Sequence, residues 1–141
     1  MQFLIERRRT NDLYTEGVLF INGNRQAPTI ESTEVMLPPG TYRLDLANSN
    51  AHKRQLVIKT PRGKPTGWQI GTCHSWKGSK SHKTIGIGEV LKPGILFKGS
   101  VILERIFKRL EKVVDRHETI ELVIDNTPCV VSAPISYWSP K

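Results

Sequence analysis

Short apolar runs separated by turn residues dominate the first half of the chain. Residues 17–21 are apolar and lead into an Asn-Gly pair, which tolerates the positive φ angles of a tight hairpin turn, so 25–30 is the expected return strand. Residues 41–46 alternate polar and apolar side chains, and 55–58 form another short apolar run, so both are predicted strands. Strands at intervals of roughly ten residues predict an antiparallel β-sandwich or barrel.

The middle of the chain has a different character. Residues 61–99 are rich in glycine, lysine and serine, and short apolar pieces occur there at 68–70 and 85–87. We therefore expect a loop-dominated region held by two short strands. Loops on a rigid β scaffold are where binding and catalysis are most often found.

The last part of the chain predicts one helix and one strand. Ser100 can cap a helix that runs to about Asp115, because apolar residues recur at helical spacing, namely Ile102, Ile106, Leu110, Val113 and Val114. Acidic residues balance much of its charge, which favours a core-packing helix over a nucleic-acid-binding one. Residues 119–124 alternate and predict a strand, whereas the prolines after residue 125 predict an extended tail.

The expected fold is mainly β (α+β): one domain over 1–125, a small antiparallel sandwich or barrel with one packed helix near 100–115, and a proline-containing tail over 126–141. A length of 141 residues fits one domain, and 38% hydrophobic with 24% charged residues is typical of a globular protein.

Targeting signals are not evident. The chain has no apolar run near the ~20 residues of a membrane span, and its short apolar start is followed by charges, the reverse of a secretory signal. We expect no membrane association and a cytoplasmic protein as synthesised, with a phage particle or export by a partner as alternatives.

The formal net charge of +8 is concentrated in the middle third. Residues 51–98 contain ten basic residues and one acid, which gives +9, and the rest of the chain sums to −1. Such clustering indicates either a solvated surface or a face for an anionic partner, such as nucleic acid, a wall polymer or a carboxylate substrate. Trp68 and Trp76 would stack on bases in the nucleic-acid interpretation, and core packing is the simpler role for both rings.

Reactive side chains are densest at 67–88. Cys73 stands beside His74 among lysines, an environment in which a thiol pKa falls and a nucleophilic thiolate becomes available. On a strand, the side chains of Cys73 and His74 would point to opposite faces, so His82 is the alternative base for the Cys73 thiol. The two histidines can also form an acid–base pair, bind a metal, or serve as hydrogen-bonding loop residues.

Cysteine spacing argues against a structural metal. Cys73 and Cys129 are far apart, and the chain lacks the paired cysteines and histidines of a zinc site. We expect no metal and no cofactor, and two free thiols rather than a disulfide.

The order of short motifs over 1–125 resembles a small family of bacterial and phage-associated single domains of unknown function. Its hairpin motif T-x-G-x-L-x-I-D-G is matched by residues 15–23, its L-E-D motif by 29–31, and its I-P-x-G-x-Y motif by 37–42. The later family blocks correspond to 67–70, 85–88, the predicted helix and 120–124.

That family's histidine and Gly-Cys blocks are similar in turn to the signature of L,D-transpeptidases. These enzymes use a cysteine nucleophile, activated by histidine, to cut and re-form peptide bonds in peptidoglycan stems. By position, Thr84 replaces the nucleophile and His82 matches the preceding histidine, while Gly71 replaces the other histidine and Lys83 a glycine. A threonine hydroxyl is a much weaker nucleophile without a dedicated base.

The resemblance implies an L,D-transpeptidase-like domain with a degenerate site, weakly active or noncatalytic, that acts on or binds peptidoglycan. One alternative is a basic structural or nucleic-acid-binding protein of a virion, and another is a rebuilt cysteine hydrolase using Cys73. The expected partner is a peptidoglycan stem peptide or another anionic ligand, with nucleic acid as the alternative. The candidate catalytic residues are Cys73, His74, His82 and Thr84, and the candidate binding residues are Trp68, Trp76, Lys77, Lys80 and Lys83.

Overall fold

The computed structural model describes residues 1–48, 54–116 and 118–131. The strands are β1 (Gln2–Thr10), β2 (Tyr14–Ile21), β3 (Asn24–Ser32), β4 (Gly40–Asn48), β5 (Arg54–Lys59), β6 (Pro65–Gly71), β7 (Thr84–Ile87), β8 (Glu89–Lys92), β9 (Ile95–Phe97), β10 (Ile120–Asp125) and β11 (Val130–Val131). The helices are α1 (Trp76–His82) and α2 (Gly99–Asp115). Neither helix is long and apolar enough to cross a membrane.

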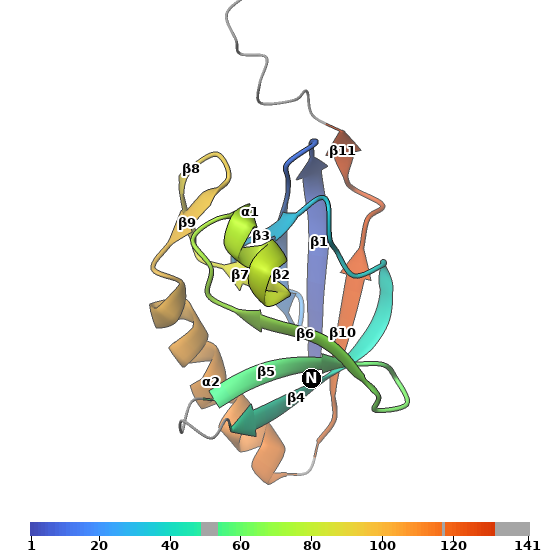
Figure 1. Cartoon of the computed structure of the whole chain (residues 1–141). Helices are drawn as coiled ribbons and strands as arrows, with labels where there is room; N and C mark the ends of the chain where they lie inside the picture. The colour runs from blue at the N-terminus through green and yellow to red at the C-terminus, as the bar shows by residue number, and fades with distance from the viewer. Residues whose placement is uncertain (49–53, 117, 132–141) are drawn as a thin grey trace, which may run out of the picture.

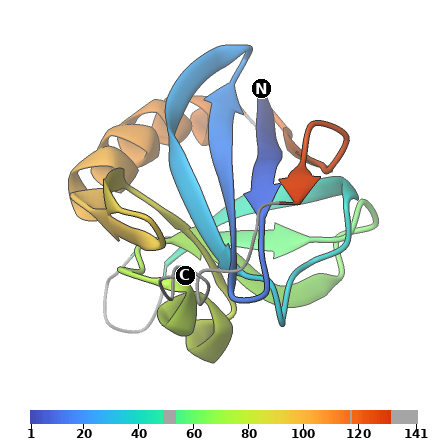
Figure 2. The same cartoon turned by 90° about the horizontal axis from the view of Figure 1, so that it is seen from above.

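Eight strands close into a barrel (Figures 1 and 2). Their order is β1-β2-β3-β7-β6-β5-β4-β10, and β10 returns to pair with β1. Neighbouring strands are antiparallel except for β6–β7 and β1–β10, which are parallel. The predicted mainly-β fold with one packed helix near 100–115 is confirmed, and its sheet is a barrel rather than a sandwich.

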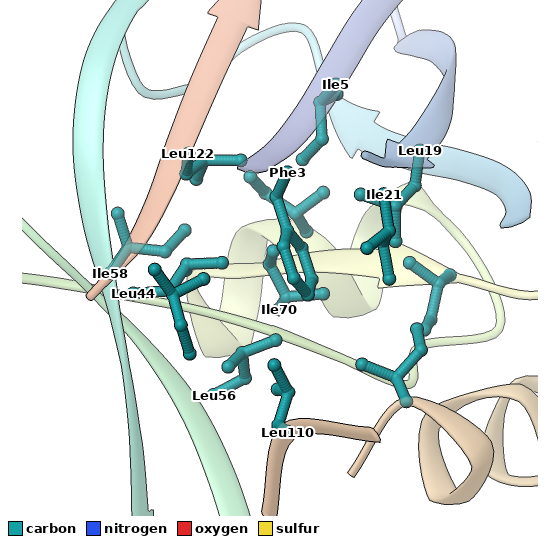
Figure 3. Packing of buried hydrophobic residues seen from close by; sticks show 14 of the residues in the cluster. Phe3, Ile5, Leu19, Ile21, Leu44, Leu56, Ile58, Ile70, Leu110 and Leu122 are labelled. Carbon is teal, nitrogen blue, oxygen red and sulfur yellow. The ribbon is translucent and has the colours of Figure 1, made fainter. Parts of the chain in front are cut away.

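Alternation along the strands fills the barrel with aliphatic side chains. Phe3 and Ile5 of β1, Leu19 and Ile21 of β2, and Leu56 of β5 are completely buried in one cluster (Figure 3). The predicted apolar stripe of α2 joins the same cluster through Ile102, Ile106, Phe107, Leu110 and Val113. Each such large side chain contributes about 1.5–3 kcal/mol on burial, so burial of this cluster is a large stabilising contribution to the fold.

A buried ion pair interrupts this apolar interior. Arg7 follows Phe3 and Ile5 at alternate positions of β1 and is as deeply buried as they are. Its guanidinium donates to both carboxylate oxygens of Glu31 on β3, and it also donates to the Leu37 carbonyl and to Oδ1 of Asn126. The pattern of apolar residues does not predict this pair, because an arginine on a strand is expected to face solvent.

Two parts of the expected loop region are ordered into further elements. Residues 76–82 form α1, and 89–97 form the β8–β9 hairpin. The α1 sequence has no apolar periodicity and contains Gly78, which disfavours a helix, so its formation depends on packing. Ser79 supplies this packing, since it is fully buried and its hydroxyl accepts a hydrogen bond from the Ser32 backbone of β3.

Part of the predicted tail joins the edge of the sheet as a ninth strand. The short strand β11, within the expected tail, pairs in parallel with the end of β1 through Arg9 and Thr10. The remainder of the predicted tail, 132–141, lies outside the described residues.

Candidate functional site

The candidate site residues other than Trp68, which is on β6, lie on one crossover connection or at its end. Strands β6 and β7 are parallel neighbours, and the chain between them passes over the outer face of the barrel as α1 (Figure 1). Helix α1 contacts β3 and β7 there. Cys73 and His74 precede α1, and Lys83 and Thr84 follow it.

Cys73 is half-buried, and its thiol packs against the barrel. A Cβ atom added to Gly86 of β7 would lie 2.2 Å from Cys73 Sγ, so the thiol occupies the space that this glycine leaves. The side chain also packs against an apolar cluster of Tyr14, Ile30 and Leu96 on the outer face of the barrel. Burial, followed by the negative charge of Glu31, raises the pKa of Cys73 from 9.0 to about 12. The prediction that the pKa of the Cys73 thiol is lowered is therefore wrong, and Cys73 is protonated at neutral pH.

The two histidines are separated by α1. His74 precedes the helix, and its backbone carbonyl accepts a hydrogen bond from Leu96 of β9 at 2.9 Å. His82 is the last residue of α1. A seven-residue helix is roughly 10 Å long, so the exposed imidazoles do not meet as an acid–base pair. Within the described residues, no cluster of histidine, cysteine or carboxylate side chains can hold a metal ion.

Thr84 is a covered residue with a satisfied hydroxyl. Its side chain is 3% exposed at the start of β7. Its Oγ1 donates to the His82 carbonyl at 3.1 Å and accepts from the Gln69 amide at 3.3 Å. Such a hydroxyl is neither accessible to a substrate nor paired with a base, as a nucleophile requires.

The four candidate catalytic residues therefore do not form one site. Cys73 and His74 share a cavity of about 210 Å³ with Leu96 and Lys98, whereas Thr84 and His82 are not among its lining residues. A neutral, half-buried thiol beside a solvent-exposed imidazole lacks the activated pair that covalent catalysis requires. This arrangement does not support the rebuilt cysteine hydrolase.

The two candidate tryptophans have different surroundings. Trp68 is 7% exposed and belongs to the main core, so the core-packing role is confirmed for it and its ring cannot stack on a base. Trp76 is half-buried, and its ring lies 5.5 Å from that of Tyr14 at an angle of 36°. Lys77 Nζ lies 5.9 Å from the centre of the Trp76 ring.

Trp76, Lys77 and Lys80 line the same groove. This groove, about 440 Å³ in volume, runs between α1, the β1–β2 turn and the segment after β3, and its lining residues are Asp12, Leu13, Ser32, Glu34, Trp76, Lys77, Lys80 and Ser81. We call it the α1 groove. Lys80 Nζ forms an ion pair with Glu34 Oε2 at 2.8 Å. Lys83 is exposed but does not line the groove, and it ends α1 with a left-handed φ of 48°.

The positive charge of the middle segment is partly neutralised by acids from elsewhere. Arg54 pairs with Glu104 and Glu111 of α2, and Lys59 pairs with Asp45 of β4. Lys80 pairs with Glu34. The other described basic side chains of this segment project from several elements, namely Arg62, Lys64, Lys77, Lys83, Lys92 and Lys98. The charge excess therefore does not form one continuous cationic loop.

The acidic side of the α1 groove was not identified from the sequence. Asp12 and Glu34 lie in connections that read as ordinary turns, and nothing in their local sequence indicates a site. Their position opposite α1 follows only from the packing of this helix on β3. The chain matches no protein-family model, no curated protein and no solved structure.

Proposed function

We propose that this protein is a noncatalytic L,D-transpeptidase-like domain that binds peptidoglycan through its stem peptides. The observation that carries the proposal is the α1 groove, which gathers Trp76, Lys77 and Lys80 beside the position of the family's catalytic block. The motif order along the chain supplies the link to the family.

Local chemistry supports the proposed absence of turnover. Thr84 stands where the nucleophile is expected, and its hydroxyl is buried and hydrogen-bonded on both sides. The nearby thiol, Cys73, has a pKa of about 12 and carries almost no thiolate at neutral pH. Lys83 keeps a left-handed backbone where the family has glycine, which is consistent with a turn retained after the reactive groups changed.

A stem peptide suits the groove because it carries carboxylates, free amino groups and small aliphatic side chains on a short chain. The groove offers cations on α1, carboxylates opposite them, and an apolar ring in Trp76. Its volume of about 440 Å³ falls in the usual range of ligand sites, roughly 300–1,000 Å³.

The test is co-sedimentation with purified sacculi, combined with mass spectrometry of any released fragments. We expect the protein to sediment with sacculi, to release no fragments, and to lose binding at least about tenfold in a Trp76→Ala/Lys77→Gln variant. Lys64→Gln removes the same charge at an exposed position in the β5–β6 turn and serves as the matched control. Failure to sediment would overturn the binding function, and fragment release would overturn the noncatalytic assignment.

A nucleic-acid-binding measurement beside the sacculi assay distinguishes peptidoglycan binding from nucleic-acid binding. If the basic surface serves nucleic acid instead, the protein binds DNA or RNA rather than sacculi, and the affinity falls about tenfold or more over a few-fold rise in salt. Burial of Trp68 removes one of the two rings that this alternative would use for stacking.

A further inference from the structure

The α1 groove has two walls of opposite charge. Lys77 and Lys80 are three residues apart on α1, a spacing that places both on one helix face. Asp12, from the β1–β2 turn, and Glu34, from the segment after β3, line the groove from the strands. All four side chains are exposed. A ligand in the groove therefore meets cations on the helix side and carboxylates on the strand side.

The lining of the groove also includes apolar side chains on both walls. Leu13 is 41% exposed, although most leucine and isoleucine side chains of the described residues are buried. Trp76 lies in the same lining, and its ring is supported by Tyr14 behind it. A supported aromatic ring and an exposed leucine in one lining provide contacts for an aliphatic or aromatic side chain.

One ion pair crosses the groove and can be exchanged for a ligand. Lys80 and Glu34 are paired at 2.8 Å, with side chains 50% and 68% exposed. Pairs this exposed contribute at most about 1 kcal/mol, so opening this one costs little. Asp12 and Lys77 form no ion pair with any described side chain and remain available to a charged ligand.

We propose that the α1 groove binds the zwitterionic end of an amino acid or short peptide. Asp12 and Glu34 hold its ammonium group, Lys77 and Lys80 hold its carboxylate, and its side chain packs on Trp76 beside Leu13. This inference rests on the proposed function, because it assigns a ligand class to the same groove. A ligand with only one charge would leave one wall unpaired and would therefore bind more weakly.

The test uses three probes that share one side chain and differ in their charged ends: leucine, N-acetylleucine without the ammonium group, and leucinamide without the carboxylate. Each is titrated at low salt into the full-length protein and followed by NMR shifts of the groove residues. We expect leucine to bind at least about fivefold more tightly than either analogue. Asp12→Asn should weaken leucine and leucinamide but leave N-acetylleucine unchanged.

Lys77→Gln should show the opposite selectivity, weakening leucine and N-acetylleucine but not leucinamide. Lys64→Gln, outside the groove, should change none of the three affinities. Equal binding of the three probes, no binding of any of them, or variants without probe selectivity would overturn the inference.

The two proposals fail separately. Retention on sacculi without discrimination among the probes overturns only the zwitterion assignment. Discrimination among the probes without retention on sacculi supports the groove's ligand class and overturns the peptidoglycan function. Failure of both assays overturns both proposals.

Discussion

Arg7 and Glu31 form a bidentate ion pair inside the barrel, with Nε–Oε2 at 2.9 Å and Nη2–Oε1 at 2.7 Å. The pair joins β1 to β3 across the intervening strand β2. Through Leu37 and Asn126, the same guanidinium also contacts the connections before β4 and after β10. One side chain therefore links four segments that close this part of the barrel.

Replacing Glu31 by leucine should destabilise the protein strongly. The change leaves the Arg7 guanidinium buried without its counter-charge, which costs about 3–5 kcal/mol of the free energy of unfolding. Urea unfolding at pH 7 measures this loss. An Arg7→Met/Glu31→Leu variant, which removes both charges, should be more stable than Glu31→Leu alone. A loss below about 1 kcal/mol in the single variant would contradict the role given to the pair.

Replacing Gly86 by alanine should destabilise the crossover under α1. The new methyl group would lie 2.2 Å from Cys73 Sγ and 2.9 Å from Ile30 Cγ2, and overpacking of this kind costs about 1–3 kcal/mol. Cys73→Ala in the same chain should restore part of the loss, because it removes the closer clash. Gly71→Ala is the matched control, since Gly71 pairs with Gly86 in register and its new Cβ would meet only Thr84 Cγ2 at 3.3 Å. Equal losses in the two alanine variants would argue against the enclosed thiol.

Cys73 should react slowly with alkylating reagents at neutral pH. With a pKa of about 12, about 10⁻⁵ of this thiol is ionised at pH 7, far less than in an ordinary free cysteine. Iodoacetamide labelling of the native protein, read by mass spectrometry of the Cys73 peptide, checks this. Labelling as fast as in the urea-unfolded chain would contradict it.

The same raised pKa predicts loss of stability at alkaline pH. Between pH 9 and about 12 the unfolded chain releases the Cys73 proton while the folded chain keeps it, so the free energy of unfolding falls as pH rises. Tyr14, Tyr42 and Cys129 also have pKa values raised by burial and add to the decline. The contribution of Cys73 is therefore measured as the difference in slope between the wild type and Cys73→Ala, which should decline less steeply. Parallel curves would contradict the prediction.

Thr84→Cys should not restore peptide-bond cleavage. The new thiol would occupy the same covered position, whereas the His74 and His82 side chains are exposed to solvent, so it would lack an activating base. Incubation with stem peptides, followed by mass spectrometry, should give the same product level as Thr84→Ala. Cleavage above that level would show that the catalytic geometry is retained and that only the nucleophile has changed.

Local periodicity is sufficient for much of the scaffold. Alternation predicts β4 and β10, the Asn-Gly turn predicts the β2–β3 hairpin, and the apolar stripe predicts α2. These features depend on contacts within one or two neighbouring elements, so the local pattern of polar and apolar residues is enough to predict them. The tryptophans and lysines of the middle segment are also visible in the sequence as candidate binding residues, and three of the five line the α1 groove.

Tertiary structure decides what the sequence pattern leaves open. The barrel closes through a parallel pairing of β1 with β10, such as Gln2 with Glu121. The local sequence pattern does not predict a strand pairing between residues so far apart in the chain. The pKa of Cys73 depends on burial under a helix that has little helical signal of its own, so the neighbouring lysines predict the wrong direction. The sequence by itself determines a β-rich domain with a basic middle segment, whereas packing of α1 on β3 partly buries the Cys73 thiol and sets two acids opposite two lysines.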